Sequence, residues 1–252
     1  MNAVGTYPRH HGLGTIDLLL RDRDQMLARI TSGDRAAILR TMVVTIAAAM
    51  ALFGAALGSY RGGIQIAYAA VKLPLVLLGT AALSAPALTA IGAARGRKPQ
   101  LVTDLALVMT ALAFGALLLA ACTPLILLGR AMDASYHSMI LATFVMFTGA
   151  GLASLWMVVR ALSKEHGPGW RSAVFGLCTV FVLVGGQLSW ALRPYLVRPR
   201  TPEVPFLREV EGSLFDAVGE TFRSSRGIYV REQAPLPGED AWAPVSYPEE
   251  TR

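Results

Sequence analysis

The sequence predicts an all-α integral membrane protein, a bundle of about five transmembrane helices with an amphipathic interfacial helix at each flank. Of its 252 residues, 54% are hydrophobic and only 16% are charged, whereas soluble domains carry about 25% charged residues. The mean hydropathy is +0.48. The apolar residues also gather into long blocks, and about 20 of them in succession cross a hydrocarbon core about 30 Å thick.

Residues 1–37 are expected to precede the membrane as a cytoplasmic segment. An amphipathic pattern runs from Ile16 to Ile30, with Leu19, Leu20 and Leu27 at mostly helical spacing and four charged residues at 21–24 between them. This pattern predicts an imperfect amphipathic helix. Such a helix lies on the membrane surface or docks on the bundle, and the sequence leaves both alternatives open.

Residues 38–194 are predicted to form the five-helix transmembrane domain. The expected spans are about Ile38–Gly58, Leu73–Ala93, Leu101–Leu128, Ser138–Val159 and Arg171–Leu192. The second apolar block begins earlier, but Lys72 and Pro74 interrupt it, so residues 65–71 are interpreted as an interfacial lead-in. Pro86 and Pro124 are expected to kink the second and third spans, since proline removes a helical hydrogen bond.

The basic residues predict the orientation of the spans. The formal net charge is +6, and the basic residues stand mainly at the ends of the apolar blocks, so membrane insertion is favoured over nucleic-acid binding. The larger and tighter clusters flank one side of the predicted bundle: Arg29, Arg35, Arg40, Arg95, Arg97, Lys98, Arg160, Lys164 and Arg171. Because positive flanks stay inside, the N-terminus is expected in the cytoplasm and the C-terminus outside.

Residues 195–252 are expected to form an external tail. Apolar residues at spacings of three to four predict an amphipathic helix over 206–222 that binds lipid or a partner through one stripe. The stripe consists of Phe206, Val210, Leu214, Val218 and Phe222. After Gln233 the tail is rich in proline, glycine and acidic residues, a composition typical of disorder.

Lys72 is the residue most open to a functional interpretation, because an ionisable group inside a span often marks a functional site. The favoured alternative is that its ammonium snorkels to the interface.

Asp104 at the start of the third span is expected to cap that helix. No second intramembrane carboxylate and no P-loop, HExxH or nucleophile-elbow pattern is present. The sequence therefore predicts no catalytic residue, no cofactor and no metal site, and free thiols at Cys122 and Cys178.

Two groups of residues are candidates for helix packing or for a functional surface. Gly149 and Ala153 form a small-xxx-small pair in the fourth span, which packs within the chain or against another subunit. The second group closes the fifth span, where two glycines, a polar amide and interfacial anchors follow one another: Gly185, Gly186, Gln187, Trp190 and Arg193. Packing and anchoring are favoured for this group over a ligand pocket.

A family resemblance rests on three stretches between about residues 15 and 222. These are Gly54 through Tyr60-Arg61-Gly62-Gly63 to Val71-Lys72-Leu73-Pro74, then Gly186-Gln187-Leu188 to Trp190 with Arg193-Pro194, and Arg208 with Glu211-Gly212-Ser213. They are similar to a family of uncharacterised multi-pass bacterial membrane proteins, and the five-span layout resembles the Yip1-type architecture. The resemblance implies a place in the bacterial inner membrane, with the tail in the periplasm, and it implies no reaction. Residues 195–198 are more basic and apolar than in that family.

The favoured function is a non-enzymatic membrane scaffold or accessory subunit of a membrane complex. Its expected partners are the lipid bilayer and other membrane subunits or a second copy of the chain. The alternative is a small transporter or channel component, in which Lys72 and Gln187 line a path. A lipid-modifying enzyme is least favoured, because the spans lack paired acid and base groups.

Overall fold

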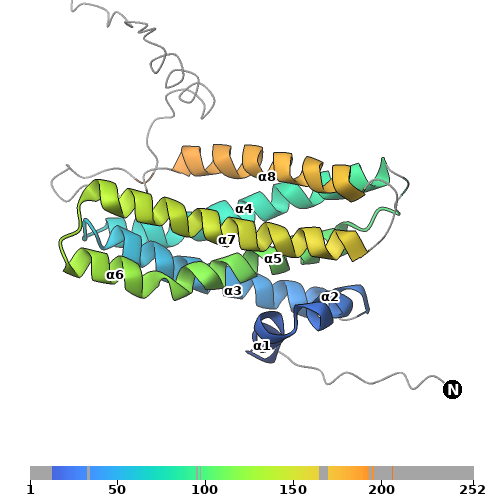
Figure 1. Ribbon diagram of the computed structural model, residues 1–252, viewed down its shortest axis with the longest axis horizontal. Coiled ribbons are helices and arrows are strands. Elements are labelled where there is room, and N and C mark those ends of the chain that lie inside the picture. Colours follow the sequence, from blue (N-terminus) through green and yellow to red (C-terminus); the bar gives the residue numbers. More distant parts are fainter. Residues whose placement is uncertain are drawn as a thin grey trace, which may run out of the picture. The chain divides into compact units, whose positions relative to one another are not determined.

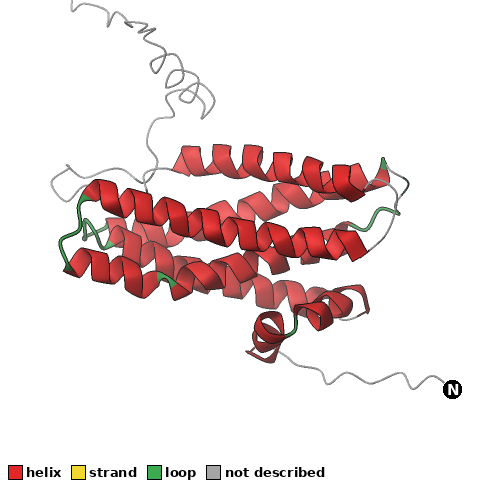
Figure 2. Cartoon of the chain, viewed as in Figure 1, coloured by secondary structure: helices red, strands yellow, loops and turns green. Residues whose placement is uncertain are grey.

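The computed structural model describes residues 13–32, 35–94, 96, 98–164, 170–192, 195 and 206. All of these residues belong to one compact unit, residues 1–211, and no residue of the second unit, 212–252, is among those described. The described residues form eight helices and no strand (Figure 2). The helices are α1 (Leu13–Arg21), α2 (Arg23–Ser32), α3 (Arg35–Gly58), α4 (Gln65–Ala93), α5 (Leu101–Ala121), α6 (Thr123–Ala131), α7 (Tyr136–Lys164) and α8 (Trp170–Leu192).

Four of the described segments are long and apolar enough to cross a membrane. They are Arg35–Gly58, Gln65–Ala93, Leu101–Ala131 and Ser138–Ser163, which correspond to α3, α4, the α5–α6 pair and most of α7. Helix α8 contains a shorter apolar stretch, Val174–Ser189. The predicted all-helical fold is thus confirmed, with four segments long and apolar enough to cross a membrane instead of the five that the sequence predicts.

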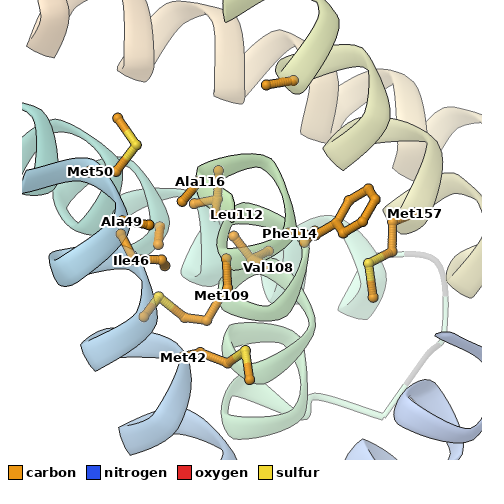
Figure 3. Packing of buried hydrophobic residues seen from close by; sticks show 14 of the residues in the cluster. Met42, Ile46, Ala49, Met50, Val108, Met109, Leu112, Phe114, Ala116 and Met157 are labelled. Atoms are coloured by element: carbon orange, nitrogen blue, oxygen red, sulfur yellow. The ribbon is translucent and has the colours of Figure 1, made fainter. Parts of the chain in front are cut away.

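Helix α5 is the centre of the bundle, and α3, α4 and α7 pack against it (Figure 1). In the α5–α6 segment 67% of the apolar stretch is buried, against 22% in α7. Figure 3 shows side chains of α3 and α5 that pack together: Met42, Ile46 and Ala49 from α3, and Val108, Met109 and Leu112 from α5. On the other side of α5, Phe114 lies next to Met157 of α7 (Figure 3).

Helices α3 and α4 approach each other most closely through two glycines of α3. A Cβ atom at Gly54 would collide with the backbone of Ala69, and one at Gly58 would collide with the backbone of Gln65. The turn between the helices also needs glycine, since Gly62 and Gly63 have φ values of 85° and 61°, a region that other residues rarely adopt. Small residues of this kind let backbones pack closely in membranes.

The predicted break at Lys72–Pro74 is wrong, because α4 runs without interruption from Gln65 to Ala93 and contains both Pro74 and Pro86. Its first turns pack against α3 at Gly54 and Gly58, so residues 65–71 belong to one continuous helix with the predicted second span. The proline at 124 does change the helix: α5 ends at Ala121, and α6 begins at Thr123 with Pro124 in its first turn.

We call the end of the bundle at residues 59–64 the Tyr60 end, and the end at residues 94–104 the Asp104 end. At the Tyr60 end, the Tyr60 hydroxyl donates a hydrogen bond to the carbonyl of Ala134 (2.9 Å). The ring of Tyr60 also lies 6.4 Å from that of Tyr136. These contacts connect the α3–α4 turn to the α6–α7 turn.

The N-terminal amphipathic segment is two short helices instead of the single predicted helix. Asp22 separates them, and its carboxylate accepts a hydrogen bond from the backbone N–H of Gln25 (2.9 Å), which is the geometry of an N-cap. The two helices dock on α3 and α5, with Leu19 and Met26 fully buried. Of the two alternatives that the sequence leaves open, the described residues show docking on the bundle.

Polar contacts fix the position of this α1–α2 hairpin. Arg160 of α7 forms an ion pair with Asp24 (2.7 Å) in which both side chains are partly exposed. The guanidinium of Arg23 lies 4.4 Å from the ring centroid of Phe114 and 5.8 Å from that of Trp156. Each contact is weak where solvent screens it, about 0–1 kcal/mol, so they set the orientation while buried apolar side chains supply most of the stability.

The first prediction tests the α3–α4 approach. Gly54→Ala should destabilise the bundle by about 1–3 kcal/mol, because the new methyl group meets backbone that cannot move away without separating the helices. Gly151→Ala is the matched control, since a Cβ there meets nothing within 4 Å. Thermal unfolding in detergent measures both variants, and equal melting temperatures would contradict the close approach.

The second prediction concerns the hairpin. Leu19→Asp should release it, because a carboxylate without a partner at this fully buried position costs about 1–3 kcal/mol or more. Trypsin cleavage after Arg21, Arg23 and Arg29, followed by mass spectrometry, should accelerate by about tenfold. The neighbouring Leu20 is 46% exposed, so Leu20→Asp should leave the cleavage rate unchanged. A hairpin that is cleaved equally fast in both variants is not docked through Leu19.

Candidate functional site

Lys72 is fully buried, which is rare for a lysine without a partner. It follows the first residue of α4 by seven positions, about 10 Å along the helix at 1.5 Å per residue. Its Nζ atom has no hydrogen-bond partner among the described residues. The sequence predicts an ammonium that extends to the head groups, whereas here protein covers it.

The ring of Phe206 lies against this lysine. The Nζ atom of Lys72 is 5.2 Å from the ring centroid, within the range of a cation–π contact. The ring of Tyr68 meets Phe206 edge to face, with centroids 5.2 Å apart and planes at 79°. Tyr68 and Lys72 are four residues apart and therefore share one face of α4. Phe206 thus contacts the chain's own bundle, while Val210, Leu214, Val218 and Phe222 of the predicted stripe lie outside the described residues.

A second buried ionisable group, Asp104, lies at the opposite end of the bundle. It is only 1% exposed, and its carboxylate accepts a hydrogen bond from the Thr89 hydroxyl of α4 (2.7 Å). Asp104 stands in the first turn of α5, where its charge complements the helix dipole. The residue that precedes α5 is Gln100, which makes no side-chain cap. Asp104 therefore links α4 to α5 in addition to complementing the dipole of α5.

Helix α8 packs along α4 through small residues on both helices. A Cβ at Gly79 would lie 2.7 Å from Leu188, and one at Gly185 would make an ordinary contact of 3.5 Å with Thr80. Gly186 and Gln187 are half-buried. The predicted packing group is therefore located on a helix–helix contact, although the side chain of Trp190 and all of Arg193 lie outside the described residues.

Tyr195 lies three residues after the end of α8. Its hydroxyl donates a hydrogen bond to the carbonyl of Ser189 (2.9 Å). Burial raises the pKa of Tyr195 to about 12, although the hydrogen bond to Ser189 acts in the opposite direction. The phenol is therefore neutral at physiological pH and serves as a hydrogen-bond donor that fixes the chain after α8.

The small-residue pair on α7 does not form the contact within the chain. The close approach of α7 to α5 occurs at Ala150 and Ser154, which pack on Gly115. Gly149 is exposed, and a Cβ there would meet nothing within 4 Å. Ala153 packs partly against the core. Exposed apolar side chains surround Gly149 on α7: Leu141, Phe144, Val145, Leu152 and Trp156.

An apolar hollow of about 270 Å³ lies between α5, α7 and α8. Six of its lining residues are Val108, Leu112, Gly151, Leu155, Leu177 and Val182. Ser154 also lines it, but its hydroxyl donates to the carbonyl of Ala150 (2.9 Å). Such a lining offers van der Waals contact to an apolar group and brings no acid–base pair together.

Sequence reasoning identified Lys72 and Asp104 but missed their neighbours. Thr89 was missed because a threonine in an apolar helix usually bonds to its own backbone. Periodicity alone places Phe206 in a stripe that binds lipid or a partner, and it gives no sign of a contact with α4. The spacing of Tyr68 and Lys72 on one helical face was the one local signal that an aromatic side chain from elsewhere could cover both.

Among the described residues, no group of three or more His, Cys, Asp or Glu is placed to hold a metal ion. The chain matches no protein-family model, and no curated protein and no solved structure shows significant similarity to it.

The third prediction tests the link between α4 and α5. Thr89→Val should lower the free energy of unfolding by about 1–3 kcal/mol, because the buried carboxylate of Asp104 loses a hydrogen bond. Thr143→Val is the control, since that hydroxyl bonds only to the carbonyl of Met139 in its own helix. Denaturation in detergent should separate the two variants, and equal shifts would show that Asp104 does not depend on Thr89.

Proposed function

We propose that the chain is a non-enzymatic, five-span scaffold or accessory subunit of the bacterial inner membrane, with a cytoplasmic N-terminus and a periplasmic C-terminus. Helix α8 supplies the fifth span. It has 23 residues, about 34 Å at 1.5 Å per residue, which suffices to cross the core. Its contacts with α4 run from Gly176 beside Ile91 to Leu188 beside Gly79.

The observation that carries the scaffold function is the open face of α7. This helix gives one side to α5 and leaves Gly149 exposed among large apolar side chains. A glycine that contacts nothing within its own chain lets a second helix approach its backbone closely, and such approach drives helix association in lipid. We propose that this face docks a transmembrane helix of another subunit.

The centre of the bundle supports a static role. The hydroxyls of Thr80 and Thr110 both donate to carbonyls one turn earlier in their own helices. Where α3 comes closest to α4, Gly54 and Gly58 of α3 lie directly against the backbone of α4. The two threonine hydroxyls are therefore satisfied within their own helices, whereas the buried Ser84 hydroxyl and the Lys72 ammonium of α4 have no described partner.

A small transporter or channel component is the second candidate function. The observation that favours it is Lys72, a buried cation in a span, because such groups often face a substrate or ion path. Gln187, half-buried on α8, would be the other polar group on this path.

The fourth prediction tests the docking face. A photo-crosslinking amino acid at Leu152, which is 62% exposed on α7, should trap a discrete protein in native membranes. The same probe at Val44, 66% exposed on α3, should trap only lipid. Adding Gly149→Leu should abolish the Leu152 adduct by blocking close approach, whereas Ala48→Leu, at an exposed position of α3, should leave it unchanged.

Four outcomes separate the candidates. An adduct with another membrane protein supports the accessory-subunit role, and an adduct with a second copy of the chain supports self-association. Lipid adducts alone at Leu152 would rule out a docking face on α7. Ion or solute flux through purified protein in liposomes that Lys72→Met abolishes would favour the second candidate.

A further inference from the structure

Lys72 has no counter-charge on its own helix, α4, or on the neighbouring α3. The sequence from Arg35 to Thr103, which includes all of α3 and α4, contains no acidic residue. The Nζ atom also lacks a hydrogen-bond acceptor among the described residues. Burying an ammonium without an anionic partner costs free energy. For a role of Lys72 beyond packing, this partner has to come from outside these helices.

The side chain that covers Lys72 comes from a distant part of the chain. Phe206 follows the last residue of α8, Leu192, by fourteen positions. Its ring contacts two residues of one face of α4, Tyr68 at its edge and the Lys72 ammonium at 5.2 Å. A cation is attracted more weakly to a ring face than to an anion, because the ring carries a quadrupole and no net charge. An anion that reaches Lys72 would therefore displace the ring.

The depth of Lys72 selects the kind of anion. The residue lies about 10 Å along α4 from the Tyr60 end, within reach of the head-group layer for a long side chain. The abundant anions at that depth are phosphates, and lysine binds phosphate as a compact point charge. The α3–α4 contact at Gly54 and Gly58 closes the adjacent side of α4, at Gln65 and Ala69, so the anion approaches from the side where Tyr68 and Phe206 lie.

We propose that Lys72 is the cationic centre of a phosphate-binding site at the Tyr60 end, and that Phe206 is its displaceable cover. The phosphate belongs to a lipid head group or is free in solution, and the chemistry at Lys72 is the same in both cases. This site is separate from the docking face on α7 and stands without it.

Amine labelling of the full-length protein in detergent tests the cover. The chain has three lysines, Lys72, Lys98 and Lys164, and Lys98 is exposed, so mass spectrometry reads Lys72 against an internal reference. Lys72 should react slowly in the unmodified protein. Phe206→Ala should accelerate its labelling by about tenfold relative to Lys98, through loss of the cation–π contact and of the cover. Phe206→Trp should keep the slow rate.

The ligand is tested on the Phe206→Ala protein and on the unmodified chain. Phosphatidylglycerol, compared with neutral detergent, should protect Lys72 of Phe206→Ala from labelling, and inorganic phosphate is the second arm. Protection by the lipid alone identifies a head-group site, and protection by inorganic phosphate identifies a site for free phosphate. In native mass spectrometry, Lys72→Arg should retain the protecting ligand, and Lys72→Gln should lose it.

Two results would overturn the proposal. If Lys72 reacts as fast as Lys98 in the unmodified protein, or no faster after Phe206→Ala, Phe206 is not a cover. If neither phosphatidylglycerol nor inorganic phosphate slows labelling of Phe206→Ala, Lys72 is not a phosphate site. Both labelling experiments use protein in which Lys72 is intact. A folding defect of Lys72→Gln therefore does not decide the outcome.

Discussion

Close packing of α5 against α3, α4 and α7 is the interaction on which the rest of the structure depends. Lipid is as apolar as leucine, so burial of apolar surface provides little force between helices in a membrane. Van der Waals contact at short distance has to provide it. Gly115 of α5 lets α7 approach at Ala150 and Ser154, and Gly54 and Gly58 do the same between α3 and α4. Helix α8 then packs on the outer side of α4.

This frame places two ionisable groups inside protein at opposite ends of α4 and α5. At the Asp104 end the buried carboxylate is satisfied locally, because Thr89 donates to it across the helix pair. At the Tyr60 end the Lys72 ammonium has an aromatic neighbour and no described acceptor. One end is therefore a hydrogen-bonded link between two helices, and the other is a site that a ligand could complete. This asymmetry distinguishes a structural polar residue from a candidate binding residue more clearly than either residue type alone.

The outer elements of the bundle are held by different contacts from those of the central helices. The α1–α2 hairpin is held by fully buried Leu19 and Met26, and the Asp24–Arg160 pair sets its orientation. Helix α7 packs mainly against α5 and less extensively against α6 and α8, and its exposed face leaves Gly149 and its apolar neighbours to lipid or to another helix.

The sequence by itself determined the all-helical fold class, four of the five expected spans as long apolar helices, and the amphipathic character of the N-terminal segment, because these depend on the length and composition of continuous stretches. Only the tertiary structure decided which faces pack. The spans are apolar on all sides, so periodicity did not show that Ala150 and Ser154, not Gly149 and Ala153, meet α5. The continuity of α4 through Pro74 and the contacts of Phe206 with Lys72 and of Thr89 with Asp104 were likewise out of reach. Each of them depends on residues brought together from separate helices, and local spacing carries no record of such distant neighbours.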